Sequence, residues 1–310
     1  MSATFNRLKE WRNELNICIR CGYCYENCHM FKLTSWETDT PRGKLVLLHA
    51  LLDNELEPSN DITEKIFECF YCKKCSDNCS AKVSVTDIFT AARQDLLEAG
   101  FDADGVTAHI DEDYCSRCRL CISVCKTEAL SWDAENKKVV RDKIKCQGCG
   151  TCVATCPSGI IVQKEGYAVS RRELEERVKE ITSRFLIFCC NWELYPGLRL
   201  SRTEGPQTDT HTVIVNMCSG RIEPELILEA FNKGVDGVMI ACCPPDECEH
   251  DGNYKAMRRV AFLKCLLPEL GIESSRLKID YFKAKEGAKL KNEVDKFIKD
   301  IFSLIHQGGE

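Results

Sequence analysis

Sixteen of the chain's 23 cysteines fall into four copies of one spacing, CxxCxxCxxxC. The four runs are Cys18, Cys21, Cys24, Cys28; Cys69, Cys72, Cys75, Cys79; Cys115, Cys118, Cys121, Cys125; and Cys146, Cys149, Cys152, Cys156. Three thiolates spaced in this way can each ligate a different iron of one cubane. The fourth cysteine of the run then ligates the other cluster of a pair. The sequence therefore predicts four 4Fe–4S clusters.

The spacing and the composition exclude several other classes of protein. Tetrahedral zinc sites separate their CxxC pairs by about a dozen residues or more, and disulfide scaffolds are usually short and secreted, whereas this chain has 310 residues. A formal charge of −6 argues against nucleic acid binding. No apolar run approaches the roughly 18 residues that span a membrane, and residues 1–16 lack the apolar core of a secretory signal. We expect a cytoplasmic protein.

Each pair of runs is expected to exchange its fourth cysteines. The predicted ligand sets are Cys18, Cys21, Cys24, Cys79; Cys69, Cys72, Cys75, Cys28; Cys115, Cys118, Cys121, Cys156; and Cys146, Cys149, Cys152, Cys125.

The spacers predict that the two pairs are built differently. Residues 41–58, between the first two runs, carry apolar residues at helical spacing. A second helix is expected over residues 85–100, with Thr86 or Asp87 as its cap and Gly100 as its stop. The shorter spacer before Cys146 reads as a hairpin around residues 135–136. The first pair is therefore expected to be helical and the second a compact βαβ-type ferredoxin.

Both pairs resemble known modules. The segments CIRCGYCYENCHMF, TPRGKLVLLHALL and CFYCKKCSDNC resemble the α-helical ferredoxin of heterodisulfide reductase C subunits, over residues 10–100. Residues 107–165 resemble a bacterial two-cluster ferredoxin, with Pro157 after the last cysteine as expected. His29, Ser80 and Lys126 stand where such modules often have proline. These departures concern loop geometry and not ligation.

After Gly166 the pattern changes to alternating strands and helices. Strands are expected over residues 184–190, 211–218, 235–243 and 276–284, and helices over residues 171–185, 223–234, 253–271 and 286–305. This alternation favours a parallel sheet covered by helices.

Six of the remaining seven cysteines lie at or just after predicted strand ends. They are Cys189, Cys190, Cys218, Cys242, Cys243 and Cys248. The carboxyl ends of parallel strands gather at one edge, where ligands bind, so these residues predict a further metal cluster. We expect Cys265 to be a small buried apolar residue in its helix. His250 is expected to be a solvated loop residue rather than a hydrogen-bond partner of a cluster.

The segments MCSGRIEPELILEAFNKGVDGVMIACCPPDEC and GNYKAMRRVAFLKCLLPELGIE resemble delta subunits of methyl-viologen-reducing hydrogenase, over residues 184–300. The resemblance implies one 2Fe–2S cluster. Its ligands would be Cys218, Cys243, Cys248 and either Cys189 or Cys190. We prefer Cys190, because it is the last residue before the chain leaves its strand.

The chain also departs from this family. Glu193 stands where the family commonly has cysteine, and Pro244 where it often has histidine. If the missing cysteine were a ligand, Glu193 or the second cysteine of the doublet would have to replace it.

The chain is thus expected to be multidomain, α+β and α/β. The predicted domains are an α-helical ferredoxin at 1–104, a bacterial-type ferredoxin at 105–166, and a delta-subunit-like α/β domain at 167–310. We expect an electron-transfer protein without catalytic residues. By resemblance, its partners are a heterodisulfide reductase A-like flavoprotein and a further redox module, namely a hydrogenase, a formate dehydrogenase or a reductase. We expect no nucleic acid partner and no direct membrane span.

The alternative is a catalytic iron–sulfur protein that reduces a disulfide-type substrate. Heterodisulfide reductase B subunits bind a catalytic cluster through CCG motifs, whereas this chain has CCN and CCP. The sequence shows no acid–base constellation around such a site.

Overall fold

The computed structural model describes residues 5–26, 28–167, 169–190, 210–283 and 286–307. The chain divides into two compact units. The first comprises Met1–Ile110, Ala129–Gly148 and Gln163–Tyr167, and the second comprises Asp111–Glu128, Cys149–Val162 and Ala168–Glu310. The predicted middle domain, 105–166, is therefore shared between the units, and the division into three domains stays a prediction.

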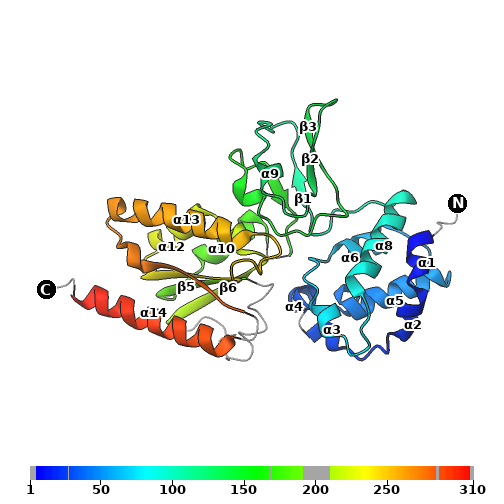
Figure 1. Ribbon diagram of the computed structural model, residues 1–310, viewed down its shortest axis with the longest axis horizontal. Helices are drawn as coiled ribbons and strands as arrows, with labels where there is room; N and C mark the ends of the chain where they lie inside the picture. Colours follow the sequence, from blue (N-terminus) through cyan, green and yellow to red (C-terminus); the bar gives the residue numbers. More distant parts are fainter. Residues whose placement is uncertain (1–4, 27, 168, 191–209, 284–285, 308–310) are drawn as a thin grey trace. The chain divides into compact units, whose positions relative to one another are not determined.

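Helices form most of the first unit (Figure 1). They are α1 (Asn6–Glu10), α2 (Arg12–Ile17), α3 (Tyr23–Glu26), α4 (His29–Thr34), η1 (Glu37–Asp39), α5 (Pro41–Leu52), α6 (Asn60–Phe67), α7 (Lys74–Asp77) and α8 (Val85–Glu98). The predicted helices after the first and second cysteine runs are confirmed as α5 and α8.

The ends of α5 and α8 follow from local chemistry. Thr40 caps α5 by accepting a hydrogen bond from the Gly43 N–H, and Pro41 occupies the first turn. The predicted cap of α8 is wrong, because Ser84 holds the N-cap position and Thr86 is buried in the first turn. The helix starts early because Val85 is already in the core. Gly100 follows the helix at φ +88°, so the predicted stop is confirmed.

Arg93 on α8 fixes the chain just before the second cysteine run. Its side chain is fully buried, and the guanidinium lies 4.5 Å from the ring centroids of both Phe67 and Tyr71. It also donates hydrogen bonds to the carbonyls of Ile66, Phe67 and Cys69, at 3.0–3.2 Å. These bonds tie the backbone at Cys69 to the core.

The segment between the third and fourth runs forms the predicted hairpin. Strands β2 (Leu130–Asp133) and β3 (Lys138–Arg141) are antiparallel. Asp133 accepts hydrogen bonds from the N–H groups of Glu135 and Asn136, which closes the turn. The remaining elements of the ferredoxin segment are β1 (Ala108–Ile110), α9 (Leu120–Ser123), η2 (Val153–Thr155) and β4 (Ile161–Gln163).

The second unit contains the predicted parallel sheet. Its strands are β5 (Phe185–Cys190), β6 (His211–Asn216), β7 (Gly237–Cys242) and β8 (Leu277–Tyr281), in the order β6-β5-β7-β8. Every neighbouring pair is parallel. The helices and turns are α10 (Arg171–Lys179), η3 (Ser219–Arg221), α12 (Pro224–Asn232), α13 (Gly252–Leu266), η4 (Leu267–Leu270), η5 (Ser274–Arg276) and α14 (Gly287–Gln307). The first of these helices ends at Lys179, earlier than expected.

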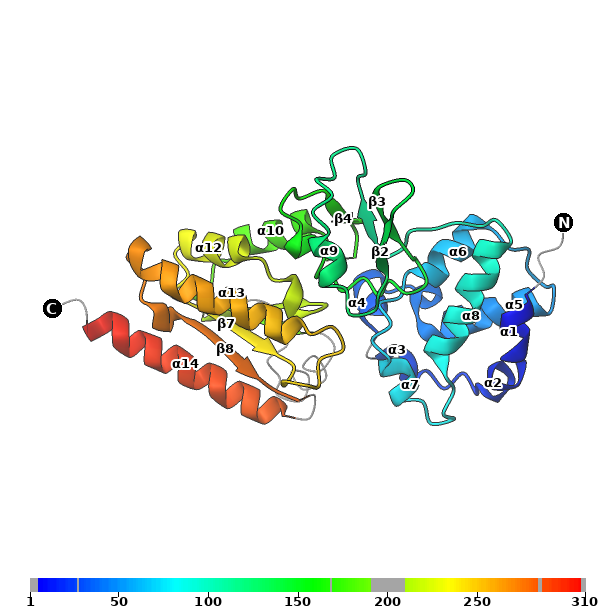
Figure 2. The ribbon, with the colours of Figure 1, turned by 45° about the horizontal axis from the view of Figure 1, so that its top comes forward.

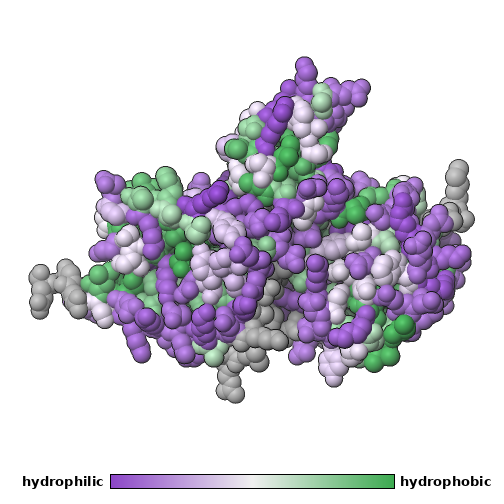
Figure 3. All heavy atoms as spheres, viewed as in Figure 1, coloured by the Kyte–Doolittle hydropathy of each residue, from purple (hydrophilic) through white to green (hydrophobic). Residues whose placement is uncertain are grey.

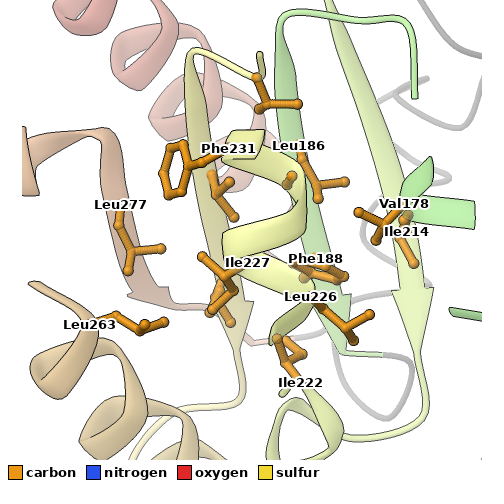
Figure 4. Packing of buried hydrophobic residues seen from close by; sticks show 14 of the residues in the cluster. Val178, Leu186, Phe188, Ile214, Ile222, Leu226, Ile227, Phe231, Leu263 and Leu277 are labelled. Carbon is orange, nitrogen blue, oxygen red and sulfur yellow. The ribbon is translucent and has the colours of Figure 1, made fainter. Parts of the chain in front are cut away.

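Helices cover both faces of this sheet (Figures 1 and 2). On one face, Leu226 and Ile227 of α12 pack with Leu186 and Phe188 of β5 (Figure 4). The alternate β5 residues, such as Phe185, belong to a second apolar cluster with residues of α14. In Figure 3 hydrophilic side chains cover the lower left of the view, where α14 runs. All β5 positions are buried because both faces of the sheet are covered.

The expectation that Cys265 is buried is wrong. Cys265 is exposed, and the neighbouring Phe262 is 64% exposed. The buried positions of α13 include Ala256, Val260 and Leu263, which recur at helical spacing. Cys265 falls outside this stripe. Within the described ranges, no helix is both long and apolar enough to cross a bilayer.

We predict that Arg93→Met destabilises the first unit. The substitution leaves three carbonyls without their charged donor, at a cost of roughly 2–4 kcal/mol. Hydrogen exchange of the α6 and α8 amides in the anaerobic protein should accelerate accordingly. Arg172→Met is the control, because the Arg172 side chain is 65% exposed. Equal protection in both variants would contradict the role given to Arg93.

Candidate iron–sulfur sites

The first two cysteine runs gather around two hollows in the first unit. Cys28, Cys69, Cys72 and Cys75 line one hollow, to which Cys24 also contributes. Cys18, Cys21, Cys24 and Cys79 line the other. The last cysteine of each run thus lies with the first three of the other run. This is the grouping that exchange of the fourth ligand requires.

Lys44 of α5 is a charged group that the sequence analysis missed. It is 2% exposed and lines the first hollow. Its ammonium donates to the Glu68 carbonyl at 2.5 Å. Burial lowers the pKa of Lys44, whereas negative charge on the nearby sulfurs of Cys69 and Cys28 raises it. A buried lysine needs negative partners, and a thiolate-ligated cluster would supply them. No local sequence signal marks its burial, because helix α5 also carries Arg42 and His49.

The third predicted ligand set is also brought together, in the second unit. Burial raises the pKa of Cys121 to about 11, and the charges of Cys115, Cys118 and Cys156 add to that rise. The fourth set is divided between the units, since Cys146 belongs to the first unit and its three partners to the second.

The cysteines of the second unit's sheet meet at the carboxyl edge. The Sγ atoms of Cys190 and Cys243 are 3.4 Å apart. Cys243 also interacts with Cys248, and Cys248 with Cys218. These four thiols therefore form one continuous buried chain. They are the four residues preferred from the sequence as 2Fe–2S ligands.

The other two strand-end cysteines also lie in apolar clusters. Cys189 shares the cluster on the α14 side of the sheet with Cys190, Cys243 and Cys248. Cys242 belongs to the cluster on the opposite side, and burial raises its pKa. Cys242 and the ligand candidate Cys243 thus fall in clusters on opposite sides of the sheet. Glu193 lies outside the described residues.

The protonation of these cysteine side chains depends on whether iron is bound. Burial raises the pKa of Cys24 and Cys72 to about 11, so these side chains are thiols at neutral pH unless iron binds them. In the second unit, the hydrogen bond to Cys190 raises the pKa of Cys243, whereas the one from Cys218 lowers the pKa of Cys248. Because iron binds thiolates, loading these sites must release protons.

Two buried polar residues beside the strand-end site fit a sulfur-rich group. Asn216 pairs in register with Cys190 and is 1% exposed. Neither atom of its side-chain amide has a partner among the described residues. His250 is 3% exposed, so the expectation of a solvated histidine is wrong. Its backbone N–H interacts with Cys248, and burial lowers the pKa of its ring to about 4.

In the first unit, the two cysteine sets line hollows rather than converge on one point. Across the described part of the chain, no three or more His, Cys, Asp or Glu side chains group so as to hold one metal ion. Cysteine thiolates are the usual ligands of iron–sulfur clusters, and the grouped cysteines fit that chemistry. Bound clusters would supply one-electron oxidation and reduction.

We predict that Gly252→Ala disrupts the strand-end site. A Cβ at this position would overlap the Cys218 Sγ and would lie 2.7 Å from the Gly220 nitrogen. Such overpacking typically costs about 1–3 kcal/mol. The anaerobic protein should unfold at a lower temperature and show more reactive thiols. Arg258→Ala, an exposed change in the same helix, should stay within about 0.5 kcal/mol of the parent. Unchanged thiol reactivity in Gly252→Ala would be the contradictory result.

The chain matches three family models. Residues 185–304 match the family described as methyl-viologen-reducing hydrogenase, delta subunit. Residues 14–83 and residues 114–160 each match a 4Fe-4S dicluster domain. The matches cover all four cysteine runs and the strand-end cysteines.

Several known proteins are similar to parts of the chain. The chain is 46% identical to the D-type iron-sulfur subunit of the vhc F420-non-reducing hydrogenase of Methanococcus voltae, over 39% of this chain and 83% of that protein. It is 36% identical to the corresponding D-type hydrogenase protein of Archaeoglobus profundus, over 41% of this chain and 93% of that protein.

A third similarity covers more of the chain. It is 36% identical, over 69% of its length, to the A-type subunit of the ferredoxin/F(420)H(2)-dependent CoB-CoM heterodisulfide reductase of Methanosarcina acetivorans. The matched stretch spans only 28% of that relative.

These matches confirm the resemblance to hydrogenase delta subunits and the presence of two dicluster ferredoxin segments. The chain belongs to the family of methyl-viologen-reducing hydrogenase delta subunits, joined here to two 4Fe–4S dicluster domains.

Proposed function

We propose that the chain relays single electrons between a heterodisulfide reductase A-like flavoprotein and another redox subunit of a cytoplasmic complex. That second partner is a hydrogenase, a formate dehydrogenase or a reductase module. The observation that carries the proposal is the grouping of cysteines into cluster-sized sets in both units.

Four 4Fe–4S clusters and one 2Fe–2S cluster make up the proposed relay. The cubane ligands are the four sets with exchanged fourth cysteines, and the 2Fe–2S ligands are Cys190, Cys218, Cys243 and Cys248. The hollows of the first unit support the first two sets. The chain of thiols at the sheet edge supports the last. The proposed domains are 1–104, 105–166 and 167–310, a helical ferredoxin, a bacterial-type ferredoxin and a delta-subunit-like domain.

The proposed flavoprotein partner is supported by the third relative. In the Methanosarcina reductase, a stretch similar to 69% of this chain is built into the large A-type polypeptide itself. The presence of this stretch in an A-type polypeptide supports a functional association of the present chain with a protein of that type. Similarity to D-type hydrogenase subunits supports a link to a further redox module.

We predict that Cys190→Ala and Cys243→Ala each abolish the EPR signal of the 2Fe–2S cluster. The 4Fe–4S signals of the same reduced, anaerobically purified samples should persist, because their ligands lie elsewhere in the sequence. Cys265→Ala is the matched control, since Cys265 is exposed and outside all sets. A 2Fe–2S signal that survives in both ligand variants would refute the assignment of the strand-end site.

We predict that Lys44→Met lowers the reduction potential of a cluster in the first unit. Removing a buried positive charge disfavours the more negative, reduced state. A tenfold change in a one-electron equilibrium is about 59 mV, and we expect a shift on that order. A redox titration followed by EPR measures it, with the exposed Lys9 replaced by methionine as the control. A potential equal to that of the control would rule out electrostatic tuning by Lys44.

A further inference from the structure

In the second unit, the loop after Cys149 lies against the loop after Cys218. The Thr151 hydroxyl is 3.6 Å from the Cys149 Sγ. The same hydroxyl oxygen would lie 2.8 Å from a Cβ at Gly220, so no side chain fits between them. Thr151 is 2% exposed, and the contact is therefore shielded from water.

The contact continues to the sulfur of Cys218. A Cβ at Gly220 would lie 2.9 Å from the Gly252 Cα, and a Cβ at Gly252 would overlap the Cys218 Sγ. Glycine at both positions allows this close approach of backbones. The series of contacts from the Cys149 sulfur to the Cys218 sulfur thus consists of the Thr151 side chain and the backbone of Gly220 and Gly252.

Arg259 of α13 ties the two loops together. Its guanidinium donates to the carbonyls of Gly220 and Ile222, at 2.7 and 2.9 Å. It also donates to the Ala154 carbonyl and the Thr155 hydroxyl, both at 3.2 Å. One planar side chain thus fixes the distance between two cysteine loops that are far apart in the sequence.

A second arginine brings positive charge to the same place. Arg221 is 1% exposed and pairs through one nitrogen with the buried Glu223. Its Nε and Nη2 atoms have no partner among the described residues. Burial lowers the pKa of Arg221, whereas the negative charges of Glu223 and Cys152 oppose that shift. These unpaired donors suit a negatively charged, sulfur-rich group beside the contact between the two cysteine loops.

We propose that the Thr151–Gly220–Gly252 contact is the electron passage between the Cys149/Cys152 site and the strand-end site, and that Arg259 is the residue that positions it. The inference rests on the proposed function, because it needs both sites to hold clusters. One electron leaves the reduced site and reduces the oxidised one. No bond forms or breaks, and no other reactant is needed.

The physical reason is distance. Electron tunnelling slows exponentially as the gap between donor and acceptor grows. Glycine and threonine keep the gap short, and the four hydrogen bonds of Arg259 keep it constant. Loss of these bonds would let the loops separate while the cysteine ligands themselves remain in the chain.

EPR power saturation of the fully reduced, anaerobic full-length protein tests the passage. A nearby, rapidly relaxing 4Fe–4S cluster accelerates the spin relaxation of the 2Fe–2S cluster. We expect this enhancement in the wild type and a several-fold lower half-saturation power in Arg259→Met. Arg259→Lys should recover part of it, because lysine keeps the charge and can make some of the bonds. Arg258→Met, on the exposed side of the same helix, should match the wild type.

Each result has a separate meaning. A wild-type 2Fe–2S signal without relaxation enhancement would overturn the passage and leave the proposed function intact. The passage would also be overturned, and the proposed function left intact, if the 2Fe–2S cluster of Arg259→Met with full iron content shows the same spin relaxation as the wild type. A wild type without any 2Fe–2S signal would overturn the proposed function and the passage together. If Arg259→Met loses iron, Thr155→Val removes one of the four bonds and should lower the enhancement by a smaller factor.

Discussion

The structure depends on crowded, buried sulfur. Burial raises the pKa of Cys72 and of Cys121 to about 11, so several thiolates in one such place need a positive partner. Bound iron would supply that charge. Arg93 fixes the chain at Cys69 through carbonyls, and Lys44 places an ammonium among thiols. The apolar cores of both units serve to keep these short cysteine loops in place.

The two units bring their cysteines together with different local structure. In the first, short helices carry the cysteine runs around two hollows. In the second, parallel strands end together and deliver Cys190 and Cys243 to one edge. Arg259 then joins that edge to a ferredoxin loop of the same unit. A relay needs such fixed contacts, because each transfer depends on a distance that must not vary.

Much of this arrangement could be predicted because spacing determines it. Three thiolates at two-residue intervals have few ways to bind one cluster, and alternating strands and helices predict a parallel sheet whose ends converge. Sequence reasoning failed where tertiary packing determines whether a side chain is buried. His250 reads as a loop residue but is buried. Cys265 has apolar neighbours in the sequence, yet it lies outside the buried stripe of α13. Neither the burial of Lys44 nor the clamp by Arg259 has a local signature, since both depend on residues far away in the chain.

The proposed relay requires the cysteines to hold a full set of clusters. The most direct measurement is the iron and acid-labile sulfide content per chain after anaerobic purification. Four cubanes and one binuclear centre predict about 18 iron atoms and about as many sulfides. About 16 irons would mean that the strand-end site holds no cluster and that the delta-subunit segment only docks the chain. A colourless protein without iron would contradict the proposed relay.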